Sequence, residues 1–504
     1  MTAIKAQLGV IGLGVMGKNL SLNLADHGYQ TAVYNRTPHV TNEFLNYCRQ
    51  HEPSWQSILG FHELEAFVQA IEKPRKILLL VKAGKPTDLT IESLLAFLDP
   101  GDVIVDCGNA YWLDTIRRER ELRQQNIDFI GSGVSGGETG ARYGPSLMAG
   151  GTLEAWQKIE PIWMAIAAKV DPKTGEPIEG AKPGRPVTGG EPCAARVGEN
   201  GAGHYVKMVH NGIEYIDMQL IAECYWLLKH LLKLPENQIG QLFTTWNQGD
   251  LASYLIEITA DILQQPDPHG EGFLVEKILD VAGQKGTGKW TAISALDLGV
   301  PTNSLAEAVF ARYMSAMKQE RQKASSIFPA PEPQLPTDPS AFKKQIQATL
   351  YGAKICAYAQ GFQLLREAQN PFGWHFDFAT LAKIWRGGCI IRARFLQKIT
   401  SAYQANPALE NLLLDPYFRD VVHSGQASWR KVVASAVVNG QPIPALSSAL
   451  AYFDSYRSAT LPANLIQAQR DYFGAHTYQR VDRPRGKHYH LDWSGDRQEQ
   501  EIPE

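Results

Sequence analysis

Four polar side chains recur at helical spacing near the middle of the 504-residue sequence. They stand at i, i+3, i+4 and i+7, and they are Lys207, His210, Asn211 and Glu214. At this spacing they share one face of a helix that the sequence predicts over residues 202–228. A partly buried lysine is a plausible general base because desolvation lowers its pKa, and Glu214 would add a second proton-transfer group. The alternative is a solvated charged face.

A glycine pattern at the start of the chain indicates a nucleotide site. A strand predicted over Gln7 to Ile11 leads into Gly12-x-Gly14-x-x-Gly17, and a helix is expected from Met16 to His27. This order is the context that a dinucleotide fingerprint requires. Gly12 would make the tight turn, Gly14 would let the backbone approach a pyrophosphate, and Gly17 would pack helix on strand. The alternative is a glycine-rich turn without a ligand.

The end of the next strand favours NADP over NAD. This strand, Thr31 to Tyr34, runs into Asn35, Arg36 and Thr37, where an NAD enzyme normally carries an acid for the ribose 2′-hydroxyl. Here an arginine stands between two small polar side chains. A guanidinium attracts a 2′-phosphate, which a carboxylate would repel. The alternative is an ordinary polar turn.

Further short apolar runs predict a doubly wound α/β sheet of the Rossmann kind, mostly parallel. They lie at 76–81, 103–106 and 129–131, with helical patterns between them. Polar or glycine-rich residues follow these strands: Lys82-Ala83-Gly84, Asn109 and Ser135-Gly136-Gly137. In open parallel sheets the ligand crevice lies at the carboxyl ends of the strands. We therefore expect these segments to meet at one ligand site.

Composition excludes several other classes. Lys plus Arg number 49 and Asp plus Glu 52, a net charge of −3, which argues against a nucleic-acid binder. No apolar run approaches the roughly 18 residues of a membrane span, and the apolar stretch at 8–16 lacks the cleavage site of a signal peptide. The six cysteines form no CxxC pair, which fits the cytoplasm and gives no zinc-site spacing.

Beyond about Gly198 helical patterns replace strands, which predicts a large all-α domain. Proline-rich stretches at 171–192 and 328–339 interrupt the chain, and faint similarity between 245–249 and 384–388 suggests a duplicated helical unit. The polar end is interpreted as a frayed tail or as an arm that packs on a partner. We divide the chain into a Rossmann domain at 1–197, a helical domain at 198–470 and a tail at 471–504.

The segment from Gly283 to Lys289 resembles a P-loop only superficially. Trp290 stands where a Ser or Thr should hold magnesium, and no buried strand precedes the segment. The loop could still present Lys285 and Thr287 to an anion. Charge could also come from three further side chains, Arg312 and, in the tail helix, Arg470 and His476.

Taken together, the motifs resemble those of the decarboxylating 6-phosphogluconate dehydrogenase family. They are GLGVMG, NRT, VKAG, GSGVSGGETGARYGPSLM, GAGHYVKMVHNGIEY, GQKGTGKWT, WRGGCIIR and LPANLIQAQRDYFGAHTY, in order from Leu8 to Tyr478. The resemblance implies a homodimer whose C-terminal tail reaches into the other subunit. It also implies metal-free oxidation of 6-phospho-D-gluconate by NADP to ribulose 5-phosphate, CO2 and NADPH, in the oxidative pentose phosphate pathway.

The resemblance also implies roles for individual residues. Lys207 would take the proton of the C3 hydroxyl and later return one to the oxygen, and Glu214 would protonate the carbon that becomes C1. The cofactor set would be Gly12, Leu13, Gly14, Val15, Met16, Gly17, Asn35, Arg36, Thr37, Val81, Lys82, Ala83 and Asn109. The sugar-acid end would be bound by Asn109, Ser135, Gly136, Gly137, His210 and Asn211. The phosphate would be bound by Tyr215, Lys285, Thr287 and Arg312, with Arg470 and His476 from the neighbouring subunit.

The sequence departs from the family pattern in a few places. The loop at 171–192 is longer than expected, Gly14 stands where many members have alanine, and Cys107 replaces a common glycine. Two rival functions remain open. One is another β-hydroxyacid dehydrogenase acting on a smaller acid, which would not need Lys285, Arg312 and Arg470. The other is a non-catalytic NADPH sensor, which would not need both Lys207 and Glu214.

Overall fold

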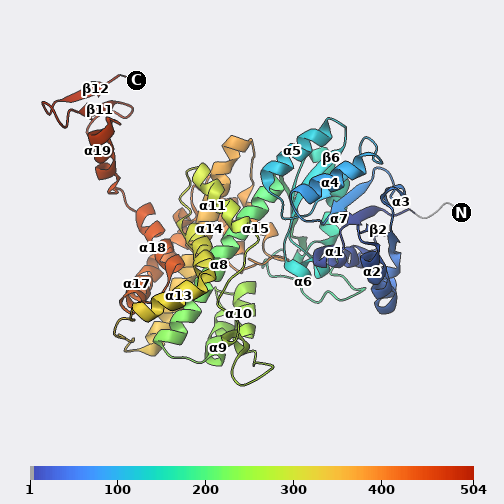
Figure 1. Cartoon of the computed structure of the whole chain (residues 1–504), viewed down its shortest axis with the longest axis horizontal. Coiled ribbons are helices and arrows are strands. Elements are labelled where there is room, and N and C mark those ends of the chain that lie inside the picture. Colours follow the sequence, from blue (N-terminus) through green and yellow to red (C-terminus); the bar gives the residue numbers. More distant parts are fainter. Residues whose placement is uncertain (1–4, 504) are drawn as a thin grey trace. The chain divides into compact units, whose positions relative to one another are not determined.

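The computed structural model describes residues 5–503, and the chain divides into two compact units between Leu450 and Ala451. The first unit contains a sheet domain and a helical region (Figure 1). No helix of the described residues is both long and apolar enough to cross a membrane.

An eight-stranded sheet forms the N-terminal part, in the order β10-β7-β6-β5-β4-β1-β2-β3. The strands are β1 (Leu8–Ile11), β2 (Thr31–Tyr34), β3 (Ile58–Phe61), β4 (Lys76–Leu79), β5 (Val103–Asp106), β6 (Asp128–Val134), β7 (Leu147–Gly150) and β10 (Ala194–Gly198). All neighbours pair in parallel except β6 and β7. The mostly parallel doubly wound sheet is therefore confirmed.

Alternating side chains along each strand build a core on both faces of the sheet. Leu78 joins one apolar cluster, whereas Ile77 and Leu79 on the same strand join the other. This is the period-two pattern of a sheet covered on both sides. The covering helices are α1 (Val15–Asp26), α2 (Pro38–His51), α3 (Leu64–Gln69), α4 (Lys85–Leu95), α5 (Trp112–Arg123), α6 (Gly137–Tyr143) and α7 (Leu153–Ile166).

The helical region is built around two long helices that pack on each other, α8 (Ala202–Leu231) and α14 (Pro339–Phe372). Each is followed by two shorter helices, α9 (Glu236–Trp246) and α10 (Tyr254–Gln264) in one case, α15 (Phe378–Ile384) and α16 (Leu396–Ala405) in the other. Ser253 and Ala393 stand at corresponding places and form an antiparallel bridge. The two series therefore share the same order of elements, while the duplication of a helical unit stays a prediction. The other α-helices are α11 (Thr287–Asp297), α12 (Asn303–Ala316), α13 (Lys318–Ile327), α17 (Pro416–Val438) and α18 (Pro444–Tyr456), the last of which contains the boundary between the two units.

The second unit is ordered, so a frayed tail is the wrong interpretation of the C-terminal residues. It contains α19 (Ala463–Gly474) and an antiparallel pair, β11 (His488–Leu491) and β12 (Glu499–Ile502). The buried carboxylate of Asp471 holds the unit together. It accepts hydrogen bonds from the backbone N–H of Thr477 at 3.0 Å and from the Trp493 indole at 2.8 Å. A satisfied buried carboxylate can organise a small unit that lacks a large apolar core.

The unit also corrects one detail of the sequence analysis. His476 does not lie in the tail helix, because α19 ends at Gly474 and Ala475 takes a left-handed conformation with φ of 47°. A residue in this conformation commonly terminates a helix.

Candidate active site

Lys207 lies at the centre of a buried polar cluster on α8. Its ammonium donates to Asn211 Oδ1 at 2.7 Å and to Ser135 Oγ at 3.1 Å, and His210 Nδ1 is 3.4 Å away. Only 6% of Lys207 is exposed. Burial lowers the pKa of Lys207 from its ordinary 10.5, although the nearby Glu214 charge raises it in part. This environment is suited to a lysine that alternates between neutral base and acid.

Two glycines let the catalytic face of α8 reach the sheet. A Cβ on Gly133 of β6 would lie 2.4 Å from Lys207 Cβ, and a Cβ on Gly203 would lie 2.2 Å from the carbonyl oxygen of Gly131. Helix α8 packs on β6 and β7 in consequence. The glycines thus place Lys207 beside the loop that follows β6, which carries Ser135.

His210 is fully buried between Lys207 and the loop after β6. Its Nε2 lies 3.3 Å from Ser135 Oγ, and the edge of its ring faces Trp385 with centroids 5.6 Å apart. Burial, together with the Lys207 charge, brings the pKa of His210 well below 6.5. The imidazole is therefore neutral and can offer one donor and one acceptor.

Glu214, one turn beyond Asn211, also lies where desolvation disfavours the charged form of its side chain. It is partly exposed, and burial raises the pKa of its carboxyl above the ordinary 4.5, with Lys207 and Arg312 opposing that rise. A carboxyl with a raised pKa can act as an acid, and a lysine with a lowered pKa as a base. The two shifts together distinguish this helix face from a solvated charged surface.

Several predicted phosphate ligands lie together beside this face of α8. The Arg312 guanidinium lies 3.5 Å from the centre of the Tyr215 ring and donates to the carbonyl oxygen of Gly283 at 3.1 Å. A Cβ on Gly288 would lie 2.5 Å from the same tyrosine ring. Thr287 begins α11, whose N-cap Gly286 offers no side-chain acceptor, so free backbone N–H groups face the loop. Lys285 stands in this loop with an exposed side chain.

The glycine fingerprint has the geometry of a dinucleotide turn. Gly12 has φ of 98°, and a Cβ on Gly17 would lie 1.8 Å from the Gly12 carbonyl oxygen, so neither position tolerates a side chain. A Cβ on Gly14 would meet nothing within 4 Å, so an alanine would also fit at this position. The backbone N–H of Leu13 donates to Asn35 Oδ1 at 3.1 Å, which ties the turn to the end of β2.

The arginine that follows β2 is exposed and can contact a ligand. Arg36 and Thr37 are exposed, and Arg36 has no polar partner among residues 5–503. Helix α1 begins at Val15 with Gly14 as N-cap and no capping side chain, so its first N–H groups can meet an anion. The residues therefore fit a dinucleotide with a pyrophosphate and a 2′-phosphate.

Most of the remaining predicted residues lie in the segments that directly follow the carboxyl ends of β4, β5 and β6. These segments are called strand exits below. The Val81 side chain lies beside the Gly12 turn, which puts the β4 exit next to the fingerprint. Lys82, Ala83 and Asn109 follow β4 and β5, which pair in parallel, so these residues share one edge of the sheet. Gly136 and Gly137 follow β6 with positive φ and begin α6. Val15 and Met16 open α1 at the same edge.

Sequence reasoning overlooked one contributor to this site. The carbonyl oxygen of Gly388 accepts from Ser146 N at 2.8 Å, and it would lie 2.5 Å from a Cβ on Gly136. The segment around Gly388 therefore packs against the loop that follows β6. The sequence showed WRGGCIIR only as a family motif and a faint repeat, and neither signal indicates what the segment contacts.

Two predicted ligands belong to the second unit. Arg470 is exposed on α19 and donates to Gln467 Oε1 at 3.0 Å, and His476 is exposed just after that helix. Among the described residues no cluster of three or more His, Cys, Asp or Glu side chains could hold a metal ion.

Comparison with known proteins gives matches over almost the whole chain. Residues 203–493 match the family described as 6-phosphogluconate dehydrogenase, C-terminal domain, and residues 7–175 match the NAD binding domain of 6-phosphogluconate dehydrogenase. A Bacillus subtilis protein named 6-phosphogluconate dehydrogenase, NADP(+)-dependent, decarboxylating is 52% identical, over 97% of this chain and 99% of its own. A Staphylococcus aureus protein named 6-phosphogluconate dehydrogenase, decarboxylating is 53% identical over the same shares.

A solved structure agrees with these matches. It is the Plasmodium falciparum 6-phosphogluconate dehydrogenase, described in its apo form and in complex with its cofactor NADP+ and its substrate 6-phosphogluconate. It has a TM-score of 0.89 and 41% sequence identity, and the alignment covers 97% of this chain and all of that one.

Proposed function

Because this chain belongs to the 6-phosphogluconate dehydrogenase family, we propose that Lys207 and Glu214 perform the proton transfers of its reaction. The enzyme oxidises 6-phosphogluconate with NADP and releases CO2, as its relatives at about 52% identity do by name. The observation that carries the assignment is that the same desolvation on α8 lowers the pKa of the buried lysine and raises the pKa of the carboxyl, which favours the neutral form of both groups.

The first step needs a base at the C3 hydroxyl. Neutral Lys207 accepts the hydroxyl proton while the C3 hydrogen leaves as a hydride and the C3–O bond becomes a carbonyl. Bound NADP supplies the hydride acceptor. Ser135 and Asn211, which accept hydrogen bonds from Lys207 in this structure, fix the direction of its amino group.

The second step releases CO2 from the resulting β-keto acid. The bond to the carboxylate carbon breaks, its electron pair moves towards the C3 oxygen, and Lys207 returns the proton to that oxygen. An ammonium held at this place stabilises the developing oxyanion. Glu214 then donates its proton to the carbon that becomes C1 of ribulose 5-phosphate, while Lys207, neutral again, removes the enol proton from the oxygen so that the ketone carbonyl forms. Its raised pKa keeps the carboxyl protonated to higher pH than an ordinary glutamate.

Binding is assigned to the two ends of the site. Arg36, with Asn35 and Thr37, takes the 2′-phosphate of NADP, while the glycine fingerprint and the exits at 81–83 and 109 hold the rest of the cofactor. The substrate phosphate is a dianion and needs a cluster of cations. Lys285 and Arg312 supply two of these cations, and Thr287 and Tyr215 add hydroxyl groups beside them.

We place Arg470 and His476 in the substrate site of a second subunit of a homodimer. In the second unit Leu465, Ile466, Tyr472 and Phe473 are each more than half exposed, and Phe473 reaches 73%. Apolar side chains exposed so fully on one helix indicate a protein contact. We also place the enzyme in the cytoplasm, because all six cysteines are buried free thiols, as expected in a reducing compartment.

One assay tests the function as a whole. The purified protein is supplied with NADP and 6-phosphogluconate, and NADPH and CO2 are followed together. Equal amounts of both are expected. NADPH without CO2 would indicate a simple β-hydroxyacid dehydrogenase, and no NADPH would remove the enzyme assignment in favour of a sensor.

Subunit complementation tests the dimer assignment. Lys207→Met and Arg470→Ala homodimers should each be nearly inactive. If Arg470 acts in the partner's site, a heterodimer of the two variants has one intact site out of two. Random mixing of refolded or co-expressed chains makes half of the dimers heterodimers, so about a quarter of wild-type activity should return. Mixtures that stay inactive would place Arg470 in its own subunit's site or outside both sites.

A further inference from the structure

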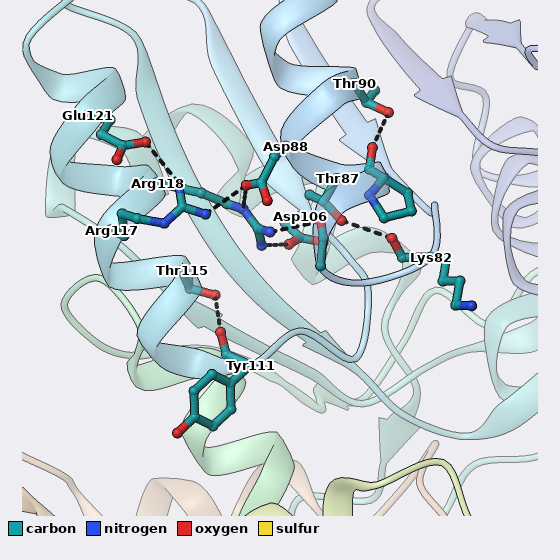
Figure 2. A network of polar contacts seen from close by, with 12 residues as sticks. Lys82, Thr87, Asp88, Thr90, Asp106, Tyr111, Thr115, Arg117, Arg118 and Glu121 are labelled. Carbon is teal, nitrogen blue, oxygen red and sulfur yellow. Dashed lines mark hydrogen bonds and ion pairs between the residues drawn. The ribbon is translucent and has the colours of Figure 1, made fainter.

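A buried arginine joins the two strand exits on the cofactor side of the site (Figure 2). Arg118 of α5 is only 2% exposed, and its guanidinium donates to the carbonyl oxygen of Gly84 at 3.1 Å and to Asp88 Oδ1 at 2.8 Å. It also lies 3.5 Å from Asp106 Oδ2. Gly84 closes the exit that contains Val81, Lys82 and Ala83, and Asp106 ends β5. Arg118 thus holds the exits of β4 and β5 at a fixed separation.

Asp106 connects these Arg118 contacts to the loop that carries Asn109. Its Oδ1 accepts the backbone N–H of Gly108 at 3.0 Å, which fixes the turn directly before Asn109. Asp106 is 1% exposed, so its carboxylate requires these partners. A buried charge that loses one partner is strongly destabilised, so this arrangement is favoured over others.

His204 connects the same loop to the catalytic helix. It lies on α8 one turn before Lys207, with Nε2 3.1 Å from the Asp106 carbonyl oxygen and Nδ1 2.7 Å from Thr115 Oγ1. A carbonyl oxygen only accepts, so Nε2 carries the proton. In the neutral ring Nδ1 then accepts a hydrogen bond from the Thr115 hydroxyl, and burial keeps the ring neutral by lowering its pKa.

We propose that Arg118, Asp106 and His204 are positioning residues that set the cofactor-side strand exits against Lys207. The inference rests on the proposed function, which places the base on α8 and the cofactor along those exits. None of the three residues has a role in the proton transfers. Hydride transfer depends on the relative placement of base, substrate carbon and cofactor, and an error of about 1 Å can cost on the order of 100-fold in rate.

A pair of amide substitutions separates positioning from packing. The His204→Gln side chain can reach the place of Nε2 and donate to the Asp106 carbonyl, whereas the shorter His204→Asn side chain can replace only Nδ1. We expect His204→Asn to lose about 10- to 100-fold in kcat, with KM for both substrates within about threefold, and His204→Gln to recover most of that loss. The deuterium isotope effect with 6-phosphogluconate labelled at C3 should increase in His204→Asn, because hydride transfer becomes slower.

Adjacent arginines on α5 supply a matched control. Arg117 also donates to Asp88 Oδ1, at 2.8 Å, but the structure gives it no bond to Asp106 or Gly84. Arg118→Lys keeps the charge and loses the branched donor, so it should lower kcat and raise the isotope effect, whereas Arg117→Lys should change neither. Thermal unfolding is followed for every variant.

The outcomes distinguish this inference from the proposed function. If wild-type protein forms no NADPH, the proposed function fails. If wild type is active but His204→Asn and His204→Gln lose activity equally with an unchanged isotope effect, or if Arg118→Lys behaves like Arg117→Lys, the network only stabilises the fold and the inference is wrong.

Discussion

The proton-transfer cluster on α8 and the cation at the end of β2 use basic side chains in opposite ways. Lys207 is buried and its amino group contacts three polar side chains, whereas Arg36 is exposed and has no polar partner within residues 5–503. A general base must lose its proton easily, and desolvation supplies that property. A 2′-phosphate ligand must keep its charge and present a free guanidinium. The same formal charge therefore serves chemistry in one place and recognition in the other.

The largest expected effect is at the buried lysine. Lys207→Met should lower kcat by about 10⁴-fold, near the upper end for general acid–base catalysis. NADP should still bind, because the glycine fingerprint lies at the turn from β1 into α1, away from α8. Steady-state NADPH formation and NADP titration by fluorescence measure the two properties. Residual turnover above about 1% of wild type would mean that another group is the base.

Loss of the carboxyl should be less severe. Glu214→Gln removes the proton donor for the last step but leaves Lys207 in place, so kcat should fall by about 10²- to 10³-fold. Rapid-mixing measurements should still show NADPH formed in the first turnover. A first turnover slowed as much as the steady state would assign Glu214 to the oxidation step instead.

The exposed cation should affect affinity and leave the chemistry intact. Arg36→Glu should weaken NADP binding by about 100-fold, because a charge-assisted contact becomes a repulsion, while NAD binding changes by less than about threefold. The control is Arg49→Glu, which reverses the charge of an exposed arginine on α2 and should leave the affinity for both cofactors unchanged. Equal losses for NADP and NAD in Arg36→Glu would contradict the 2′-phosphate assignment.

The sequence predicted features that are encoded locally. The glycine fingerprint and the spacing of Lys207, His210, Asn211 and Glu214 are properties of short segments, and both were found where expected. Strand β7 was not predicted, since its sequence LMAG shows neither alternation nor β-branched residues. The limits of the tail helix were also misjudged, because a left-handed alanine ends it.

Other features depend on contacts between distant segments. Gly133 and Gly203 are separated by 70 positions in the sequence, and nothing in either segment shows that α8 lies on β6 at that point. The bond between His204 and the Asp106 carbonyl is likewise a tertiary contact. A sequence can show which side chains could do chemistry, whereas the groups that hold them in place appear only when the chain is folded.

The central claim is that burial on α8 prepares Lys207 as the base, and the pH dependence of Glu214→Gln tests it most directly. With the carboxyl removed, Lys207 is the proton-transfer group left on this face, and it is active only when neutral. The rate of first-turnover NADPH formation should therefore rise with pH to a plateau, with a midpoint clearly below the ordinary lysine pKa of 10.5. A midpoint at or above 10.5, or a rate independent of pH, would contradict the assignment of Lys207 as a base prepared by burial.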